Sequence, residues 1–364
     1  MVLMVLDHVR DYFTEIRYDP TDLNRTSLAL FATRWITHYC APVFIFLAGA
    51  SAWVAGTRRT RGRLARFLLT RGLWLILLEV TVVSMGWYFT THWAMGARAQ
   101  VIWAIGVSML VLAGLLHLPR AAVAGFGLAL VLGHNLLDGI VPADFGAFAP
   151  LWRILHAPGP VEFVPVFVTY PLVPWIGVMA LGYAAGPVVF AKDAAASRRL
   201  AWAGLAMSLG FVALRTLDGY GDPSPRLGAG SPALLAMSFL NTTKYPPSLL
   251  FLLMTLGPAL LGLALLHRAR GPAAGFFVTF GRVPLLFYVA HLYVVHALAV
   301  IAGMAQGFPG SSIRTVYRLL PEGYGFGLPV VYLVWLGVVA ALYPLCRRYA
   351  RLKARGRAWW LSYL

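Results

Sequence analysis

Charged and imidazole side chains recur near the ends of the hydrophobic segments of this sequence, in positions where they can do chemistry. The first hydrophobic run contains Asp7, His8, Arg10 and Asp11. Similar groups lie in or beside later hydrophobic runs, at Arg34, His38, His134, Asn135, Asp138, Asn241, Lys244, His291 and His296. Ionisable groups in apolar segments are costly and are usually functional. Their repetition predicts a polar cavity that opens toward one face of the molecule.

Helical spacing brings some of these residues together. Three pairs are four residues apart and share a helix face, namely Asp7 with Asp11, Arg34 with His38, and His134 with Asp138. A carboxylate beside an imidazole fixes the tautomer of the ring and raises its basicity, as a base in acyl transfer requires. His8 and His38 are candidates for catalysis or substrate contact. His291 and His296 are five residues apart and point in different directions, so one can line a site while the other packs.

These residues divide into two predicted groups. The predicted catalytic residues are His8, His38, Asp7, Asp11 and His291. The predicted substrate-binding residues are Arg10, Arg34, His134, Asn135, Asp138, Asn241 and Lys244. Each has a structural alternative, since a salt-bridged helix end or a helix cap uses the same residue types. Glu79 lies within a hydrophobic run, where we predict a structural pairing.

The composition of the chain is typical of an integral membrane protein. Of 364 residues, 60% are hydrophobic and only 12% are charged, which no soluble domain of this size needs. The sequence predicts an all-α, polytopic integral membrane protein, a single bundle of about ten transmembrane helices. The expected spans are Met1–Phe13, Trp35–Gly56, Phe67–Tyr88, Val101–Leu118, Ala121–Val141, Val164–Phe190, Leu200–Leu217, Pro246–His267, Val283–Gly303 and Gly327–Cys346.

The distribution of charge sets the orientation of this bundle. With both termini inside, the inner segments hold most of the 30 Lys and Arg residues but only one acid, Asp193. Basic inner loops are the usual orientation signal of membrane proteins, so the net charge of +17 argues against nucleic-acid binding. Among these, Arg58, Arg59 and Arg61 are candidates to bind a phosphate-bearing ligand of the cytosol. Orientation alone, or anionic lipid, also explains a basic inner face.

The sequence has none of several common catalytic motifs. It has no Walker loop, no GxSxG serine elbow and no HExxH zinc motif. No helix carries a His-x-x-x-His pair, so no metal is expected.

The chain is expected to form one domain over residues 1–364, because no long linker separates two cores. The first span, Met1–Phe13, is short for a bilayer, which predicts a natural start codon upstream. Small residues in the run Leu47–Ser51 permit close helix packing, either within one chain or in a homodimer.

Several runs resemble one known family. MVLMVLDHVRDYF, RWITHYCAPVFIFLAG, YPLVPWIGVMALGY, NTTKYPPSLLFLLMTLGP and GRVPLLFYVAHLYVVHALA are similar to bacterial proteins grouped with the catalytic domain of heparan-alpha-glucosaminide N-acetyltransferase. The resemblance implies a transmembrane acyltransferase that moves an acetyl group from cytosolic acetyl-CoA to an amino sugar outside. It also implies that a histidine takes the proton of the acceptor, for which His8 and His38 are the candidates. Arg58, Arg59 and Arg61 would then bind the phosphates of coenzyme A. Animal members place a histidine in the first lumenal loop, whereas residues 13–27 here contain none.

The resemblance and the residues together predict a multi-pass acyltransferase of the bacterial inner membrane. Its expected partners are the lipid bilayer and an extracytoplasmic carbohydrate acceptor, with a homodimer as a candidate assembly and no nucleic acid. One alternative is a transporter, in which the same buried charges form a proton or substrate path. A noncatalytic membrane scaffold is a third reading, which leaves the histidines without a purpose.

Overall fold

The computed structural model describes residues 1–90, 97–191, 193–267, 269–315, 319–356 and 361. It confirms an all-α polytopic membrane protein. Eight helical segments in the described part are long and apolar enough to span a membrane. They are Leu28–Gly56, Arg61–Tyr88, Arg120–Leu137, Leu172–Phe190, Ala194–Leu217, Leu249–Leu266, Pro284–Ala305 and Leu328–Ala354. Two further predicted spans are shorter helices, α1 (Val2–Phe13) and α6 (Val101–Leu115).

The chain forms two compact units, and each combines segments that are distant in the sequence. Unit 1 contains Met1–Cys40, Thr81–Trp93 and Ala269–Leu364, and unit 2 contains Ala41–Val80 and Ala94–Arg268. No single boundary divides the chain. One domain over residues 1–364 stays a prediction.

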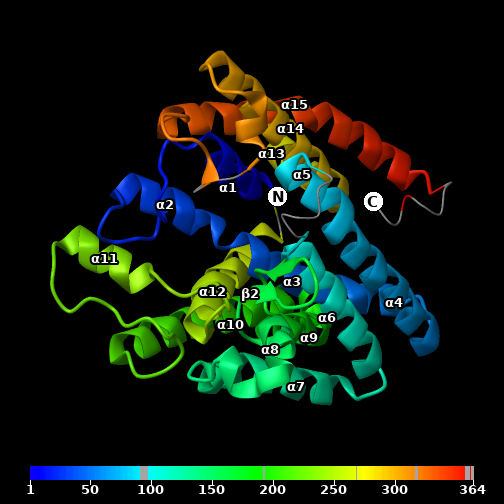
Figure 1. Ribbon diagram of the computed structural model, residues 1–364. Helices are drawn as coiled ribbons and strands as arrows, with labels where there is room; N and C mark the ends of the chain where they lie inside the picture. The colour runs from blue at the N-terminus through cyan, green and yellow to red at the C-terminus, as the bar shows by residue number, and fades with distance from the viewer. Residues whose placement is uncertain (91–96, 192, 268, 316–318, 357–360, 362–364) are drawn as a thin grey trace. The chain divides into compact units, whose positions relative to one another are not determined.

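Unit 1 is built around the first helix. Its elements are α1, α2 (Leu28–Thr37), α5 (Ser84–Tyr88), α13 (Pro272–Arg282), α14 (Pro284–Ala305), η5 (Gly310–Ile313) and α15 (Leu328–Ala354). Helix α1 packs against α2, α14 and α15 (Figure 1). The indole of Trp335 donates to the carbonyl of Val2 at 2.9 Å, which fixes the start of α1 against α15. These contacts position the polar end of α1.

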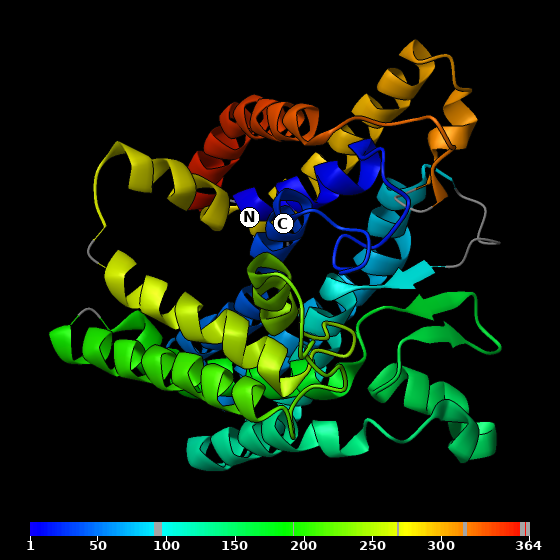
Figure 2. The same ribbon diagram turned by 90° about the vertical axis from the view of Figure 1, so that its left-hand side faces the viewer.

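Unit 2 holds most of the remaining helices. They are α4 (Arg61–Leu78), α7 (Arg120–Gly133), α8 (Ala149–Leu155), α9 (Leu172–Phe190), α10 (Ala194–Leu217), α11 (Pro232–Leu240) and α12 (Leu249–Leu266), with α6 and most of α3 (Cys40–Gly56). Helix α10 runs beside α12, α4 beside α6, and α7 beside α9 (Figures 1 and 2). Side chains of Asp193 and Ser248 cap α10 and α12 by accepting from backbone amides, as N-cap residues do. Short 3-10 turns, η3 (His134–Leu137) and η4 (Pro142–Phe148), follow α7.

A small sheet in unit 2 was not predicted. Strands β1 (Ala97–Ala99), β3 (Val166–Val168) and β2 (Gly159–Val161) lie in that order, with β1 parallel and β2 antiparallel to β3 (Figure 2). The predicted span from Val164 is therefore wrong at its start. Residues 166–168 pair as a strand, and α9 begins only after Pro171. Three-residue strands are too short for an alternating pattern to reveal.

The Leu47–Ser51 run packs within the chain. A Cβ atom on Gly49 would overlap the backbone carbonyl of Met179, and one on Gly182 would overlap that of Phe46. Helices α3 and α9 therefore approach so closely that only glycine fits at these two positions, as at other close helix crossings in membranes. This contact is internal to unit 2.

Candidate functional site

Two histidines meet in unit 1, on helices that are far apart in the sequence. Nδ1 of His8 lies 2.7 Å from Nε2 of His291, and the rings stack with centroids 4.9 Å apart. His291 is fully buried in α14, whereas His8 is half-buried. Both were predicted as catalytic, and the structure brings them into direct contact.

The backbone decides which nitrogen of each neutral ring carries a proton. Nδ1 of His291 lies 2.8 Å from the carbonyl oxygen of Phe287, which can only accept a hydrogen bond. His291 therefore donates from Nδ1 and accepts at Nε2. His8 then donates from Nδ1, so the lone pair of neutral His8 is on Nε2. This is the tautomer that a general base needs.

Helix α5 and the residues next to it support this pair. The ring of Trp87 meets the His8 ring edge-on, with centroids 4.8 Å apart. Tyr12 donates to the carbonyl of Trp87 at 2.7 Å. Nδ1 of His296 lies 2.8 Å from the carbonyl of Gly86, so His296 fastens α14 to α5. His296 is thus the packing member of the His291 and His296 pair.

An ion network lies beside His8 on α1 and α2. Asp7 accepts from Arg10 at 2.8 Å, from Arg34 at 2.7 Å and from Thr37 at 3.0 Å. Arg10 also bridges Asp11 at 2.7 Å and is almost fully buried. Two acids thus neutralise two arginines, as buried charge requires. The network joins α1 to α2 and fixes the residue next to His8.

His38 lies buried at the C-terminal end of α2. The structure therefore places His38 one residue beyond Thr37, which belongs to the ion network. His38 remains the second candidate for the base.

The ligand atoms of His134 and Asp138 lie within 4.8 Å of each other, but no hydrogen bond joins the two side chains. Asp138 instead accepts from the amide of Asn135 at 2.7 Å, and its other oxygen lies 3.2 Å from Nε2 of His156. Burial of Asp138 opposes ionisation, but the hydrogen bonds from His156 and Asn135 outweigh it and lower the pKa of this carboxyl. Asn135 also accepts from the backbone amide of Leu249 at 2.8 Å. All of these residues belong to unit 2.

Asn241 and Lys244, the other predicted substrate-binding residues of unit 2, lie between α11 and α12, and Asn241 contacts a buried arginine. The carbonyl of Asn241 accepts from Arg215 at 2.9 Å. The ammonium of Lys244 lies over the ring of Tyr245, 5.2 Å from its centroid. Arg215 also donates to the carbonyls of Ser224, Ser238 and Phe239. Arg215 therefore organises the chain between α10 and α12.

Replacing Arg215 with methionine is expected to destabilise the protein by at least about 3 kcal/mol. Arg215 loses its hydrogen bonds to four carbonyl groups, and a hydrogen bond to a charged group contributes roughly 1.5–3 kcal/mol. The measurement is the free energy of unfolding of the detergent-solubilised protein. Arg199→Met, an exposed change on the same helix, is the control. Equal stability of the two variants would contradict this role.

Glu79 has the structural pairing that we predicted. Its carboxylate is fully buried and accepts from the backbone amide of Trp103 at 2.8 Å. Trp103 is in the first turn of α6, where amides have no partner within the helix. Glu79 thus caps α6 from the neighbouring helix.

The three arginines proposed for coenzyme A lie at the junction of α3 and α4. Arg58, Arg59 and Arg61 are exposed, and the guanidinium of Arg59 lies over the ring of Phe67 at 4.7 Å. Their exposure leaves them accessible to a polar ligand.

Sequence reasoning missed two contributors, Trp87 and His156. Trp87 lies near the end of a predicted span, and no spacing pattern relates it to His8, whose ring it contacts. His156 was not singled out, because it lies 18 residues beyond Asp138. A search for carboxylates and histidines across the loops between helices, rather than along one helix, would have found it.

Comparison with known proteins adds one match. A family model described as "Heparan-alpha-glucosaminide N-acetyltransferase, catalytic" matches residues 1–220. These residues include α1, α2 and α5, but not α14. No curated protein matches the chain.

Proposed function

Because the chain belongs to the heparan-alpha-glucosaminide N-acetyltransferase catalytic family, a family of transmembrane acetyltransferases, we propose that it transfers acetyl groups from cytosolic acetyl-CoA. The proposed acceptor is the amino group of a carbohydrate outside the bacterial inner membrane. The observation that carries the proposal is the hydrogen bond between His8 and His291, within a multi-pass membrane protein.

His8 acts as the general base in this proposal. The neutral amine of the acceptor attacks the thioester carbon, and Nε2 of His8 takes a proton from the amine nitrogen. The carbon–sulfur bond then breaks, and coenzyme A leaves as a thiol when His8 returns the proton to its sulfur. The new bond is an amide. Nε2 of His291 accepts a hydrogen bond from the Nδ1–H of His8 throughout, which stabilises the imidazolium formed between the two steps.

The other predicted residues take supporting roles. Asp7, Arg10, Asp11 and Arg34 fix the end of α1 through their ion network, so that His8 keeps one orientation. His38 is the alternative base. Asn241 and Lys244 are proposed to contact the acceptor. Arg58, Arg59 and Arg61 are proposed to bind the phosphates of the donor, because arginine pairs with phosphate through two parallel hydrogen bonds.

The test is binding of acetyl-CoA to the purified protein by calorimetry, with coenzyme A and ATP as competitors. Replacing Arg58, Arg59 and Arg61 with glutamine is expected to weaken binding at least about tenfold, since a charge-assisted hydrogen bond contributes roughly 1.5–3 kcal/mol. Glutamine at Arg347, Arg348 and Arg351, which are exposed on α15, is the matched control.

Two results would decide the proposal. Specific binding, followed by transfer of labelled acetyl to a glucosamine-containing acceptor, would support it. A folded protein that binds no acetyl-CoA would overturn it and favour a transporter. Equal affinity of the two arginine variants would remove the donor-binding role of Arg58, Arg59 and Arg61.

A further inference from the structure

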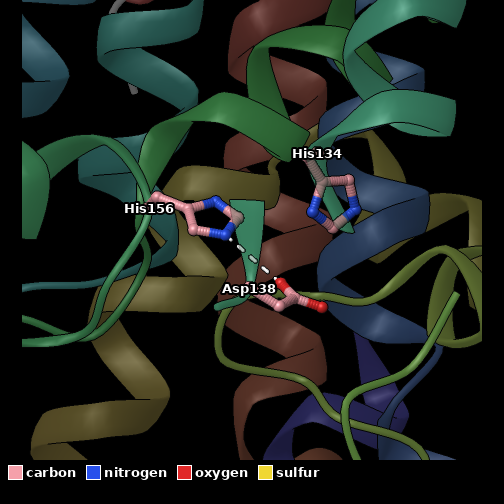
Figure 3. A group of neighbouring side chains, drawn as sticks. All are labelled: His134, Asp138 and His156. Atoms are coloured by element: carbon pink, nitrogen blue, oxygen red, sulfur yellow. Dashed lines mark hydrogen bonds and ion pairs between the residues drawn. The ribbon is translucent and has the colours of Figure 1, made fainter. Parts of the chain in front are cut away.

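Three side chains of unit 2 converge at the end of α7. His134 begins the 3-10 turn η3, Asp138 follows that turn, and His156 ends α8. Each offers one ligand atom, and the three atoms lie within 4.8 Å of one another. Figure 3 shows the two imidazoles on either side of the Asp138 carboxylate.

His134 lacks a hydrogen-bond partner among the residues that the structure describes. Both of its ring nitrogens are buried and unpaired, and the residue is only 2% exposed. A buried polar group without a partner costs roughly 1–3 kcal/mol. Nδ1 of His156 is unpaired in the same way. Buried polar atoms in this state call for an explanation, and a bound cation is one of the standard ones.

The carboxylate is already oriented by its neighbours. Asn135 donates to one oxygen of Asp138, which leaves the other oxygen turned toward His156. Asn135 is itself held by the backbone amide of Leu249, at the start of α12. Outer groups that orient a ligand in this way accompany most protein metal sites.

We propose that His134, Asp138 and His156 bind one divalent transition-metal ion, with zinc as the best fit. Two imidazoles and one carboxylate are ligands that zinc prefers, and three protein ligands leave a fourth position for water. Ligand atoms around tetrahedral zinc lie roughly 3.3 Å apart, given bond lengths of about 2.0–2.1 Å. Nε2 of His156 already lies 3.2 Å from the Asp138 oxygen, so the contraction that remains brings His134 closer to these two atoms.

This proposal reverses an expectation from the sequence. The absence of a His-x-x-x-His pair argued against a metal, but the structure combines a His-x-x-x-Asp pair with a histidine from another helix. It also assigns His134 and Asp138 to a metal rather than to a substrate. The ion would join η3 to α8 and, through Asn135, to α12.

The experiment uses the full-length protein in detergent, purified without a histidine tag and stripped with a chelator. Zinc binding is measured by calorimetry, and cobalt replaces zinc for absorption spectroscopy. The expected result is one ion per chain, tetrahedral cobalt bands, and a higher unfolding temperature with zinc because the ion binds only the folded state. His134→Gln is expected to weaken binding by at least about 100-fold, since loss of even an outer partner costs about 10–100-fold.

His134→Gln is also the variant least prone to misfold. His134 makes no hydrogen bond among the described residues, so its replacement removes none. Asp138→Asn is the second variant, and His117→Gln, at an exposed histidine of the same unit, is the control. The proposal is supported if the wild type and the His117→Gln control bind one zinc ion per chain and the two site variants do not. No zinc binding, or equal binding by wild type and both site variants, overturns it.

Discussion

Replacing His8 with alanine is expected to lower the rate of acetyl transfer by about 10²–10⁴-fold, which is the usual contribution of a general base. The binding of acetyl-CoA is expected to stay unchanged, because His8 acts on the proton of the acceptor. The loss of rate is expected because the hydrogen bonds of the two rings fix the tautomer of His8. The carbonyl of Phe287 fixes His291, and His291 in turn leaves the lone pair of His8 on Nε2. The measurement is the initial rate with labelled acetyl-CoA.

The controls separate catalysis from folding. His117→Ala changes an exposed histidine and should keep full activity. His38→Ala tests the second candidate for the base. If His8→Ala and His38→Ala both retain the full rate of transfer, the assignment of the base is wrong.

His291 is a positioning residue in this scheme, and its variants have a distinct kinetic signature. His291→Leu removes the acceptor at Nε2 and is expected to lower kcat with little change in KM. His291→Gln places an amide oxygen near the same position and should restore part of kcat. A purely structural role for His291 would instead lower activity in proportion to the fraction of protein that folds, with kcat per folded molecule unchanged.

The spacing of residues along a helix predicted which residues belong to the site, but not which residues from distant helices contact them. Asp7, Arg10 and Asp11 lie within one helical turn, and the structure joins them as a salt-bridged network. The partner of His8 lies 283 residues away on α14. Helical spacing relates residues three or four positions apart, so no sequence pattern could have paired these two rings.

The same limit explains what was missed in unit 2. The pair His134 and Asp138 was visible as a spacing of four residues. The histidine that contacts Asp138 is His156. The 3-10 turn η4 and helix α8 lie between these two residues in the sequence. Both elements lie in a loop without hydrophobic periodicity, where sequence carries little structural signal. Hydropathy, by contrast, predicted most long helices, because spanning a membrane demands a long apolar run.

A large effect on stability is also expected at the crossing of α3 and α9. Gly182→Ala places a methyl group against the backbone carbonyl of Phe46, which cannot rotate away as a side chain would. The two helices must therefore separate, and the packing of Gly49 against the carbonyl of Met179 is lost with it. Overpacking in a core costs about 1–3 kcal/mol and occasionally more. Because the contact is backbone to backbone, we expect a loss at or above the top of that range.

Gly262→Ala on α12 provides a matched control for this prediction. No atom lies within 4 Å of the position that its Cβ would occupy. Alanine there should leave the free energy of unfolding unchanged or raise it by up to about 1 kcal/mol, because alanine is more favourable than glycine in a helix interior. The two substitutions add the same atoms to two helices of the same unit, so opposite effects on the unfolding temperature would isolate helix separation as the cause. A Gly182→Ala protein that unfolds at the wild-type temperature would mean that α3 and α9 are not held as closely as their glycines allow.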